Sequence, residues 1–147
     1  MKIDIDRLMQ QRGVNGILVT GSAQDNPYMI YFTGVSHITE ADLIKKAGEA
    51  PVLFVHSMER EEAARTGLEV RILETYPLDL EAAGGDLGRA VALRYRQMLE
   101  ELGLTSGRLA LYGKVDAGVS YTVFGHLQEL MPALELVGET TSSLLLE

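Results

Sequence analysis

The sequence has 147 residues, of which 46% are hydrophobic and 23% are charged, and its formal net charge is −8. This length and balance are typical of one globular domain with a packed core, and they exclude a disordered chain. The acidic excess and the lack of a basic cluster argue against nucleic-acid binding, which needs grouped Lys and Arg side chains. The sequence contains no cysteine, which excludes a disulfide scaffold and a thiolate site and favours a reducing cytoplasm as the location.

The amino-terminal residues give no sign of a targeting segment. Charges appear at Lys2, Asp4 and Asp6, too early for the apolar core of a signal peptide. No later stretch approaches the roughly 18 apolar residues of a membrane span. We therefore expect a soluble protein without a membrane partner.

Helices and strands alternate along the chain. Apolar side chains at helical spacing predict helices over residues 5–12, 27–32, 58–66, 87–102 and 119–131. Short runs of apolar and branched residues predict strands over residues 16–20, 41–45, 51–56, 68–73, 107–112 and 135–137. Only a short turn separates the second and third strands, which predicts an antiparallel hairpin. The sequence therefore predicts an α/β fold: a mixed, mostly parallel sheet with one antiparallel hairpin and helices on both faces.

Capping residues mark the starts of three of these helices. Asn26 followed by Pro27 is typical of an N-cap and a first helical position. Ser57 and Asp86 are the expected N-caps of the third and fourth helices. These residues place helix boundaries that hydrophobic spacing alone does not fix.

A search for catalytic and metal-ligating residues returns mostly negatives. The three histidines, His37, His56 and His126, lie in different predicted elements and form no paired ligand motif. We expect His56 at a strand end and His126 half-buried with a partner. Asp4 and Asp6 lack the Gly and terminal Glu of a calcium loop, so we take them as exposed charges before a helix. No serine lies in a nucleophile elbow, and we predict neither a catalytic residue nor a metal ligand in this chain.

One segment, residues 26–37, combines three aromatic side chains with Gly34 and His37. One interpretation is structural: the side chains of residues 28 and 30–32 fill the core and Gly34 ends the helix. The other is functional: the loop after the helix presents binding groups, since loops on a rigid scaffold often do so, and His37 can both donate and accept hydrogen bonds. Residue chemistry alone leaves both open.

Several motifs follow one another in a recognisable order. They are Gly16-Ile17-Leu18-Val19-Thr20, then Asn26 with Tyr31-Phe32-Thr33-Gly34, then Pro51-Val52-Leu53-Phe54-Val55, then residues 59–63. This order resembles the amino-terminal domain of the aminopeptidase P, prolidase and creatinase family. The resemblance covers nearly the whole chain, and the later strand 109–112 and the helix that ends near Pro132 support it. It implies a ribonuclease H-like fold.

The resemblance also implies that two domains of the parent enzyme have different roles. In such enzymes a separate pita-bread domain carries two Asp, one His and two Glu, which bind two divalent metal ions, often manganese or cobalt. The amino-terminal domain helps to form a homodimer and limits access of peptide substrates to the active site. Carried over to this chain, the resemblance implies that Tyr31 and His37 are the candidate substrate-binding residues. They would form part of a pocket wall, and this wall can belong to the active site of the neighbouring subunit. The parent reaction stays open among prolidase-like, creatinase-like and lyase-like relatives.

The expected domain organisation follows from this resemblance and from the end of the chain. Residues 1–139 would form the amino-terminal domain, and residues 140–147 would begin an interdomain helix to a missing catalytic domain. The apolar run Leu144-Leu145-Leu146 favours this interpretation, because exposed ends of complete domains are seldom so apolar. The alternatives are a free-standing binding or interaction module of the same fold, and a small-ligand binder at the carboxyl edge of the sheet.

Overall fold

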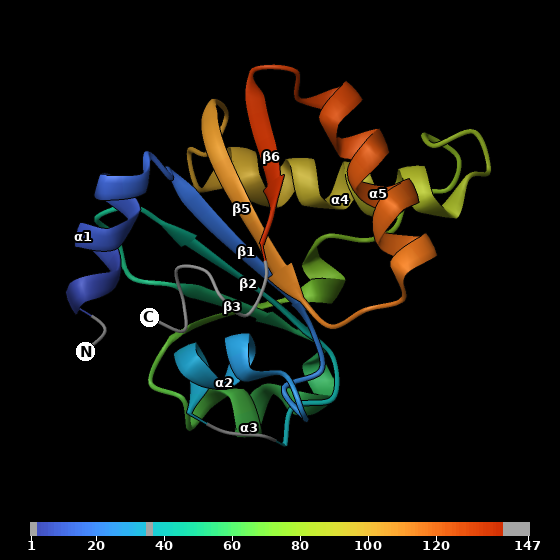
Figure 1. Ribbon diagram of the computed structural model, residues 1–147. Helices are drawn as coiled ribbons and strands as arrows, with labels where there is room; N and C mark the ends of the chain where they lie inside the picture. The colour runs from blue at the N-terminus through green and yellow to red at the C-terminus, as the bar shows by residue number, and fades with distance from the viewer. Residues whose placement is uncertain (1–2, 35–36, 140–147) are drawn as a thin grey trace.

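The computed structural model describes residues 3–34 and 37–139, which form a sheet covered by helices (Figure 1). The six strands are β1 (Gly16–Gly21), β2 (Ala41–Lys46), β3 (Val52–Val55), β4 (Glu69–Ile72), β5 (Gly107–Gly113) and β6 (Leu134–Gly138). The helices are α1 (Ile3–Arg12), α2 (Pro27–Thr33), α3 (Arg60–Ala64), α4 (Leu87–Glu101) and α5 (Ala117–Leu130), with 3₁₀ turns η1 (Ser57–Glu59) and η2 (Leu73–Thr75). The predicted elements are thus found with boundaries shifted by a few residues.

The sheet has the strand order β4-β3-β2-β1-β5-β6 and is mixed, as predicted. β2 is antiparallel to both β1 and β3, and the other three pairs are parallel. The β2–β3 pair is the predicted hairpin. β1 and β2 are joined by residues 22–40, which include the seven-residue helix α2, and β2 runs back along β1.

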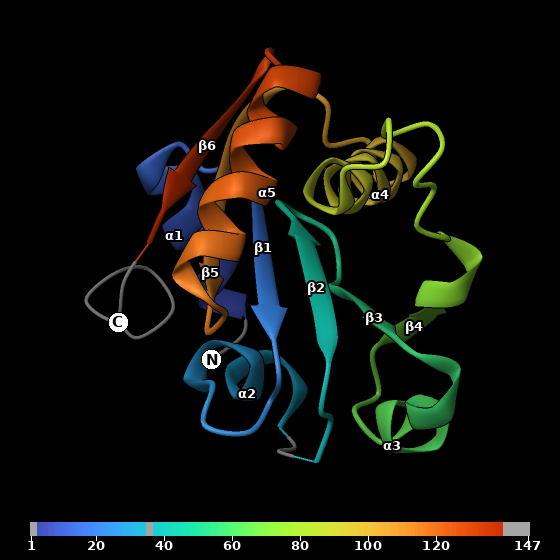
Figure 2. The ribbon, with the colours of Figure 1, turned by 90° about the vertical axis from the view of Figure 1, so that its right-hand side faces the viewer.

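Helices cover both faces of the sheet, which confirms the predicted fold class (Figure 2). α1, α2 and α3 lie on one face, and α4 and α5 pack against each other on the opposite face. β1 shows the division most clearly, because Ile17 and Val19 join the first core and Leu18 joins the second. All three side chains are fully buried, as expected for a central strand.

Two of the three predicted N-caps are present. The Asn26 Oδ1 accepts a hydrogen bond from the Met29 amide at 3.3 Å, and the Asp86 carboxylate accepts one from the Arg89 amide at 3.2 Å. The prediction for Ser57 was wrong. Its amide and hydroxyl both donate to the Glu74 carboxylate, and the chain enters α3 through the turn η1 without a side-chain cap.

A buried lysine joins α1 to the β2–β3 hairpin. Lys45 is only 3% exposed, and its ammonium donates to the Asp6 carboxylate and to the Glu49 carbonyl, both at 2.6 Å. Asp6 also accepts from the Gly48 amide at 2.8 Å. Partial burial alone would raise the pKa of Asp6, but the hydrogen bonds from Lys45 and Gly48 outweigh it and lower that pKa. Asp6 therefore lies within a helix and holds a partner, unlike the free charge expected before the helix.

β1 and β5 leave no room for a side chain between them where both strands end. Thr20 pairs with Gly113, and a Cβ added at Gly113 would lie 2.4 Å from the Thr20 carbonyl oxygen. A Cβ at Gly21 would lie 2.6 Å from the Lys114 carbonyl oxygen, and both glycines have positive φ angles. Only glycine fits this approach without moving the backbone.

The predicted interdomain helix over residues 140–147 lies outside the described residues. Within residues 3–34 and 37–139, no helix combines the length and the apolar character that crossing a membrane requires.

Candidate functional site

The loop that follows α2 is held at both ends by the scaffold. Before it, Asn26 anchors α2 to β1, since its Nδ2 donates to the Thr20 carbonyl at 3.2 Å. After it, the Ile38 carbonyl accepts from the Ala23 amide at 2.9 Å. The Glu59 carboxylate then accepts from the Thr39 amide at 2.9 Å and from the Thr39 hydroxyl at 3.1 Å. The chain on either side of this loop is therefore fixed to β1 and to the start of α3.

The structure separates the two candidate binding residues. His37 is exposed in the loop, whereas Tyr31 is half-buried in the last turn of α2, with its ring edge-to-face against Phe32 at a centroid distance of 5.0 Å. Burial, together with the negative charge of Asp4 on α1, raises the pKa of Tyr31. Among the described interactions none joins Tyr31 to His37. Their roles in binding stay predictions.

The structural interpretation of this segment is partly confirmed. Tyr28 and Phe32 are 5% and 1% exposed and fill the core beneath α2. Ile30 is 37% exposed and contributes little to that core. The aromatic side chains thus have a packing role that needs no ligand.

A second polar group lies next to this loop, around His56 at the end of β3. The His56 Nε2 is 3.2 Å from a Glu40 carboxylate oxygen, and its Nδ1 is 3.5 Å from a Glu74 carboxylate oxygen. The pKa of Glu74 is lowered by hydrogen bonds from its own amide and from Ser57, and by His56. His56 therefore lies at a strand end, as predicted, but it also links the segments that precede β2 and follow β4.

A third polar group is buried between β1, β2 and α4. The Tyr95 hydroxyl donates to the Asp42 carboxylate at 2.5 Å, and it lies 3.1 Å from the Thr20 hydroxyl. Asp42 is 8% exposed, and burial raises its pKa, although the hydrogen bonds from Tyr95 and Thr20 act in the opposite direction. Burial also raises the pKa of Tyr95. This group is a fully paired polar cluster in an otherwise apolar layer.

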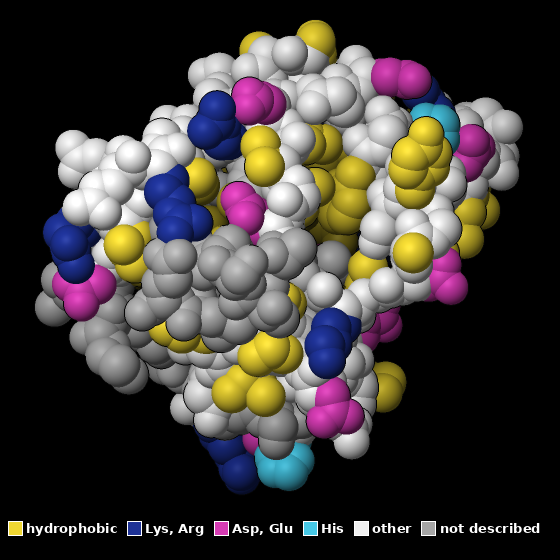
Figure 3. All heavy atoms as spheres, viewed as in Figure 1, with side chains coloured by type: hydrophobic (Ala, Val, Ile, Leu, Met, Phe, Trp, Pro, Cys, Tyr) yellow, Lys and Arg dark blue, Asp and Glu magenta, His cyan; other side chains and the backbone are white. Residues whose placement is uncertain are grey.

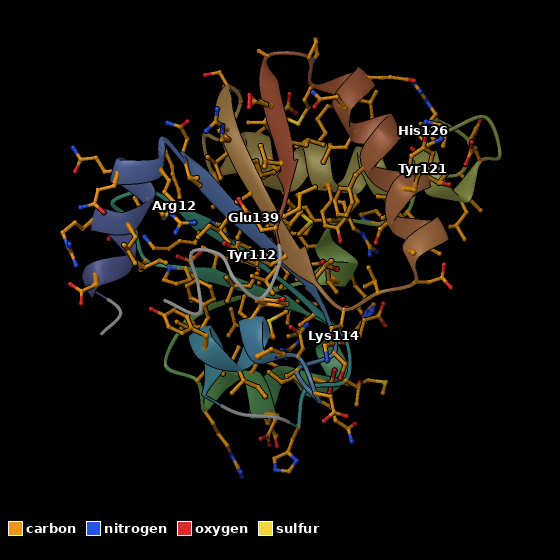
Figure 4. The ribbon with its side chains drawn as sticks, viewed as in Figure 1. Arg12, Tyr112, Lys114, Tyr121, His126 and Glu139 are labelled. Carbon is orange, nitrogen blue, oxygen red and sulfur yellow. The ribbon has the colours of Figure 1, made fainter. Side chains whose placement is uncertain are left out.

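An open hollow separates α5 from β5 and β6 (Figure 4). Tyr121 and His126 project from α5 on one side, and Leu111 of β5 and Leu136 of β6 line the other. Two adjoining cavities of about 600 and 350 Å³ share Leu111 and Phe124 as lining residues. His126 is half-buried and lies 3.3 Å from Asp86, as expected of a satisfied histidine.

The described residues do not fit a metal centre. No group of three or more His, Asp or Glu side chains is arranged within residues 3–34 and 37–139 so that it could hold a metal ion. Of the carboxylates around His56, Glu74 accepts from the Ser57 amide, and both Glu40 and Glu74 contact the imidazole. We therefore derive no step of a metal-dependent reaction from these residues.

Comparison with solved structures identifies the fold. The chain superposes on the creatinase/prolidase N-terminal domain of an X-Pro dipeptidase from Streptococcus pyogenes with a TM-score of 0.59 and 16% identity, over 97% of each chain. The chain has the fold of a creatinase/prolidase amino-terminal domain. No family model and no curated protein matches the sequence. The creatinase/prolidase-type fold predicted from the motifs is thereby confirmed.

Two longer enzyme chains share the same fold over one third of their length. An X-Pro aminopeptidase from Thermotoga maritima matches with a TM-score of 0.63 and 13% identity, over 94% of this chain and 33% of its own. A dipeptidase from Pyrococcus horikoshii matches with a TM-score of 0.57 and 19% identity, over 97% of this chain and 34% of its own. The creatinase/prolidase-type domain described here thus spans about a third of these enzymes.

Two of the three polar groups were not predicted from the sequence, the one around His56 and the one formed by Asp42 and Tyr95. An aspartate inside the apolar strand 41–45 is a signal for a buried partner, because an unpaired buried carboxylate is costly. Tyr95 on the apolar face of the long helix is the matching signal. The His56 group could not be found this way, since Glu40 and Glu74 are ordinary surface residues in the sequence.

Proposed function

We propose that this chain is the non-catalytic amino-terminal domain of an Xaa-Pro metallopeptidase. The observation that carries the proposal is the match over 97% of both chains to a domain that is itself part of an X-Pro dipeptidase. In this proposal the parent is a hydrolase of the prolidase or aminopeptidase P type. Its metal ions, two manganese or cobalt ions, and its hydrolytic residues belong to a separate catalytic domain, which is the first partner of this chain.

The proposed work of the domain is to limit access to the active site and to support a homodimer. The loop with His37 suits this role, because Asn26 anchors the chain before it and the bonds of Ile38 and Thr39 anchor the chain after it, while the His37 side chain is exposed. A wall that restricts the length of a peptide substrate must be held firmly and must still present polar groups. Tyr31, half-buried on α2, is the second candidate residue. We also propose that the parent enzyme is located in the cytoplasm, as expected from the sequence.

The proposed role of His37 predicts a change in substrate selectivity. In the parent enzyme, His37→Ala should alter kcat/KM for an Xaa-Pro dipeptide relative to a longer Xaa-Pro peptide by about tenfold, since removal of a contact in a pocket wall costs about one hydrogen bond. Glu61→Ala, an exposed change on α3, is the matched control. An unchanged ratio in His37→Ala would remove this residue from the proposed wall.

The alternative function is a free-standing binding or interaction module. The polar surface around His56 and the hollow beside α5 are the features that could serve it. The two functions differ in one observable: a reading frame that continues into a domain with the ordered Asp, Asp, His, Glu and Glu ligands supports the peptidase proposal. A frame that ends without them favours the module.

A further inference from the structure

His56 lies between two carboxylates that come from different parts of the fold. Its Nε2 is 3.2 Å from a Glu40 carboxylate oxygen in the segment before β2, and its Nδ1 is 3.5 Å from a Glu74 carboxylate oxygen on η2. We call this pair of contacts the His56 bridge. In the part of the chain that the structure describes, no ion pair joins a Lys or Arg to either carboxylate. His56 is therefore the side chain that can supply positive charge to both.

The His56 bridge is complete only when the imidazole is protonated. A neutral imidazole has one N–H, so its other nitrogen turns a lone pair toward an oxygen that carries negative charge. The imidazolium ion has an N–H on each nitrogen and can donate to Glu40 and Glu74 together. Histidine is the side chain that ordinarily gains or loses this proton between pH 5 and 8. The link between the two segments therefore depends on pH in that range.

The other charged groups on the elements next to β3 have partners of their own. They are Glu59 with the Thr39 and Glu40 amides, Arg71 with Glu69, and Asp42 with Tyr95. His37, the second histidine of this region, is exposed, and no contact among the described residues joins it to the bridge. Protonation of His56 therefore acts mainly on Glu40 and Glu74.

Glu40 connects the His56 bridge to the loop that presents His37. It directly follows Thr39, whose amide and hydroxyl donate to the Glu59 carboxylate at 2.9 and 3.1 Å. The chain after the loop thus has one anchor that needs no histidine and a second one that depends on the proton of His56. A change in this proton alters how firmly the end of the loop is held.

The exposure of the bridge sets the size of this effect. The side chains of His56, Glu74 and Glu40 are 33%, 54% and 71% exposed. At the end of the molecule that carries α2 and α3, charged and histidine side chains reach the surface (Figure 3). Ion pairs in contact with water are weak, because solvent and salt screen them. We therefore expect a several-fold change in local opening and not an all-or-none switch.

We propose that the protonation of His56 regulates the loop that carries His37. At the acidic end of the range from pH 5 to 8, the imidazolium joins Glu40 to Glu74 and holds the segment after the loop more tightly. At the alkaline end, the bridge lacks one N–H and the segment opens more often. The bridge rests on the described residues alone, whereas its effect on substrates rests on the proposed function of the loop.

Hydrogen exchange in the 147-residue chain tests the bridge. We expect the protection factors of the Thr39 and Glu40 amides, corrected for intrinsic exchange, to be about threefold higher at pH 5.5 than at pH 8. The Met29 amide, which Asn26 holds on α2, is the internal reference for opening elsewhere. His56→Gln is neutral at every pH and should remove the difference.

A second histidine and the spectrum of the folded chain provide the controls. His126 lies on α5, 3.3 Å from Asp86, so His126→Gln should keep the full pH dependence at Thr39 and Glu40. The proposal is overturned if the protection of these two amides, relative to the reference, is equal at both pH values in the parent chain. It is also overturned if the difference persists in His56→Gln while this variant keeps its native spectrum.

The parent enzyme separates the bridge from the proposed function. The ratio of kcat/KM for an Xaa-Pro dipeptide to that for a longer Xaa-Pro peptide should change by up to about threefold between pH 5.5 and 8, and this change should be absent in His56→Gln. A constant ratio together with the expected exchange results supports the bridge and contradicts the proposed access role of the loop.

Discussion

The Tyr95 hydroxyl on α4 donates a hydrogen bond to the Asp42 carboxylate on β2, 2.5 Å away, within an otherwise apolar layer. The two residues are 53 positions apart in the sequence. This contact holds α4 over β2, the strand that is antiparallel to both of its neighbours. Loss of either partner would leave a buried polar group without its bond, which costs more than the bond itself contributes.

Tyr95→Phe tests this contact. We expect the free energy of unfolding to fall by about 1–3 kcal/mol at neutral pH, because Asp42 loses its donor while it stays buried. Tyr121→Phe removes a hydroxyl from a ring that is 86% exposed and should change stability by less than about 0.5 kcal/mol. Equal effects of the two changes in urea denaturation would contradict the account.

Asp42 also predicts a pH dependence. Because burial raises its pKa above the ordinary value of 3.8, the folded chain holds this proton more tightly than the unfolded chain. The linked stability is complete below that ordinary value and is lost as the pH rises through the pKa of the folded state. The stability of the parent chain relative to Asp42→Asn should therefore decrease as the pH rises from 4 through the pKa of the folded state. A relative stability that rises over this range would show that the sign is wrong.

Asp6 predicts the opposite pH dependence. Its pKa is lowered from the ordinary value of 3.8, so its contribution is present above that value and disappears as the pH falls through the lowered pKa. Asp6→Ala should cost about 1–3 kcal/mol at neutral pH, since the buried Lys45 ammonium loses its carboxylate. Asp4→Ala is the matched control, because the ion pair of Asp4 with Arg7 is exposed and contributes little. Thermal unfolding of both variants at pH 7 and pH 3 measures the difference, which should shrink at the lower pH.

The approach of β1 to β5 predicts contrasting effects for two glycines. Gly113→Ala places a methyl group against the Thr20 carbonyl and should destabilise the domain by more than about 2 kcal/mol. Gly125→Ala lies within α5 with nothing inside 4 Å of the added carbon, and it should stabilise the domain by about 0.5–1 kcal/mol. Denaturation midpoints of the two variants would contradict this account if they shifted in the same direction.

Glu59 predicts a local effect on the loop that carries His37. Glu59→Gln weakens the bonds to the Thr39 and Glu40 amides, so hydrogen exchange at these two positions should accelerate by about tenfold while global stability changes little. Glu61→Gln, an exposed change on α3, should leave both exchange rates as they are. Slow exchange in Glu59→Gln would mean that other contacts hold the loop.

Local signals explain which parts of the fold the sequence predicts. β1 was predictable as a central strand because three consecutive apolar residues fill both faces, and α2 was predictable because Asn26 and Pro27 define its start. The role of Ser57 was not, because its preferred acceptor, Glu74, lies 17 residues away. The antiparallel β1–β2 pair was not predicted, because the alternation of strands and helices does not encode the direction of a strand after a long connection.

The candidate site was less predictable than the fold for the same reason. His37 was identifiable from its place in a loop after a capped helix, and the structure leaves its side chain exposed there. The links of His56 to Glu40 and Glu74 arise because β3 and β4 end, and the antiparallel β2 begins, on the same side of the sheet. Such contacts follow from strand order, which no single segment encodes.

The most direct test of the central claim compares this chain with the full product of its reading frame in hydrolysis of an Xaa-Pro dipeptide with added manganese or cobalt. The account predicts no hydrolysis by residues 1–147 alone, and metal-dependent hydrolysis by a longer product that carries a second domain with the Asp, Asp, His, Glu and Glu ligands. Hydrolysis by the isolated chain, or a reading frame that lacks such a domain, would contradict the claim.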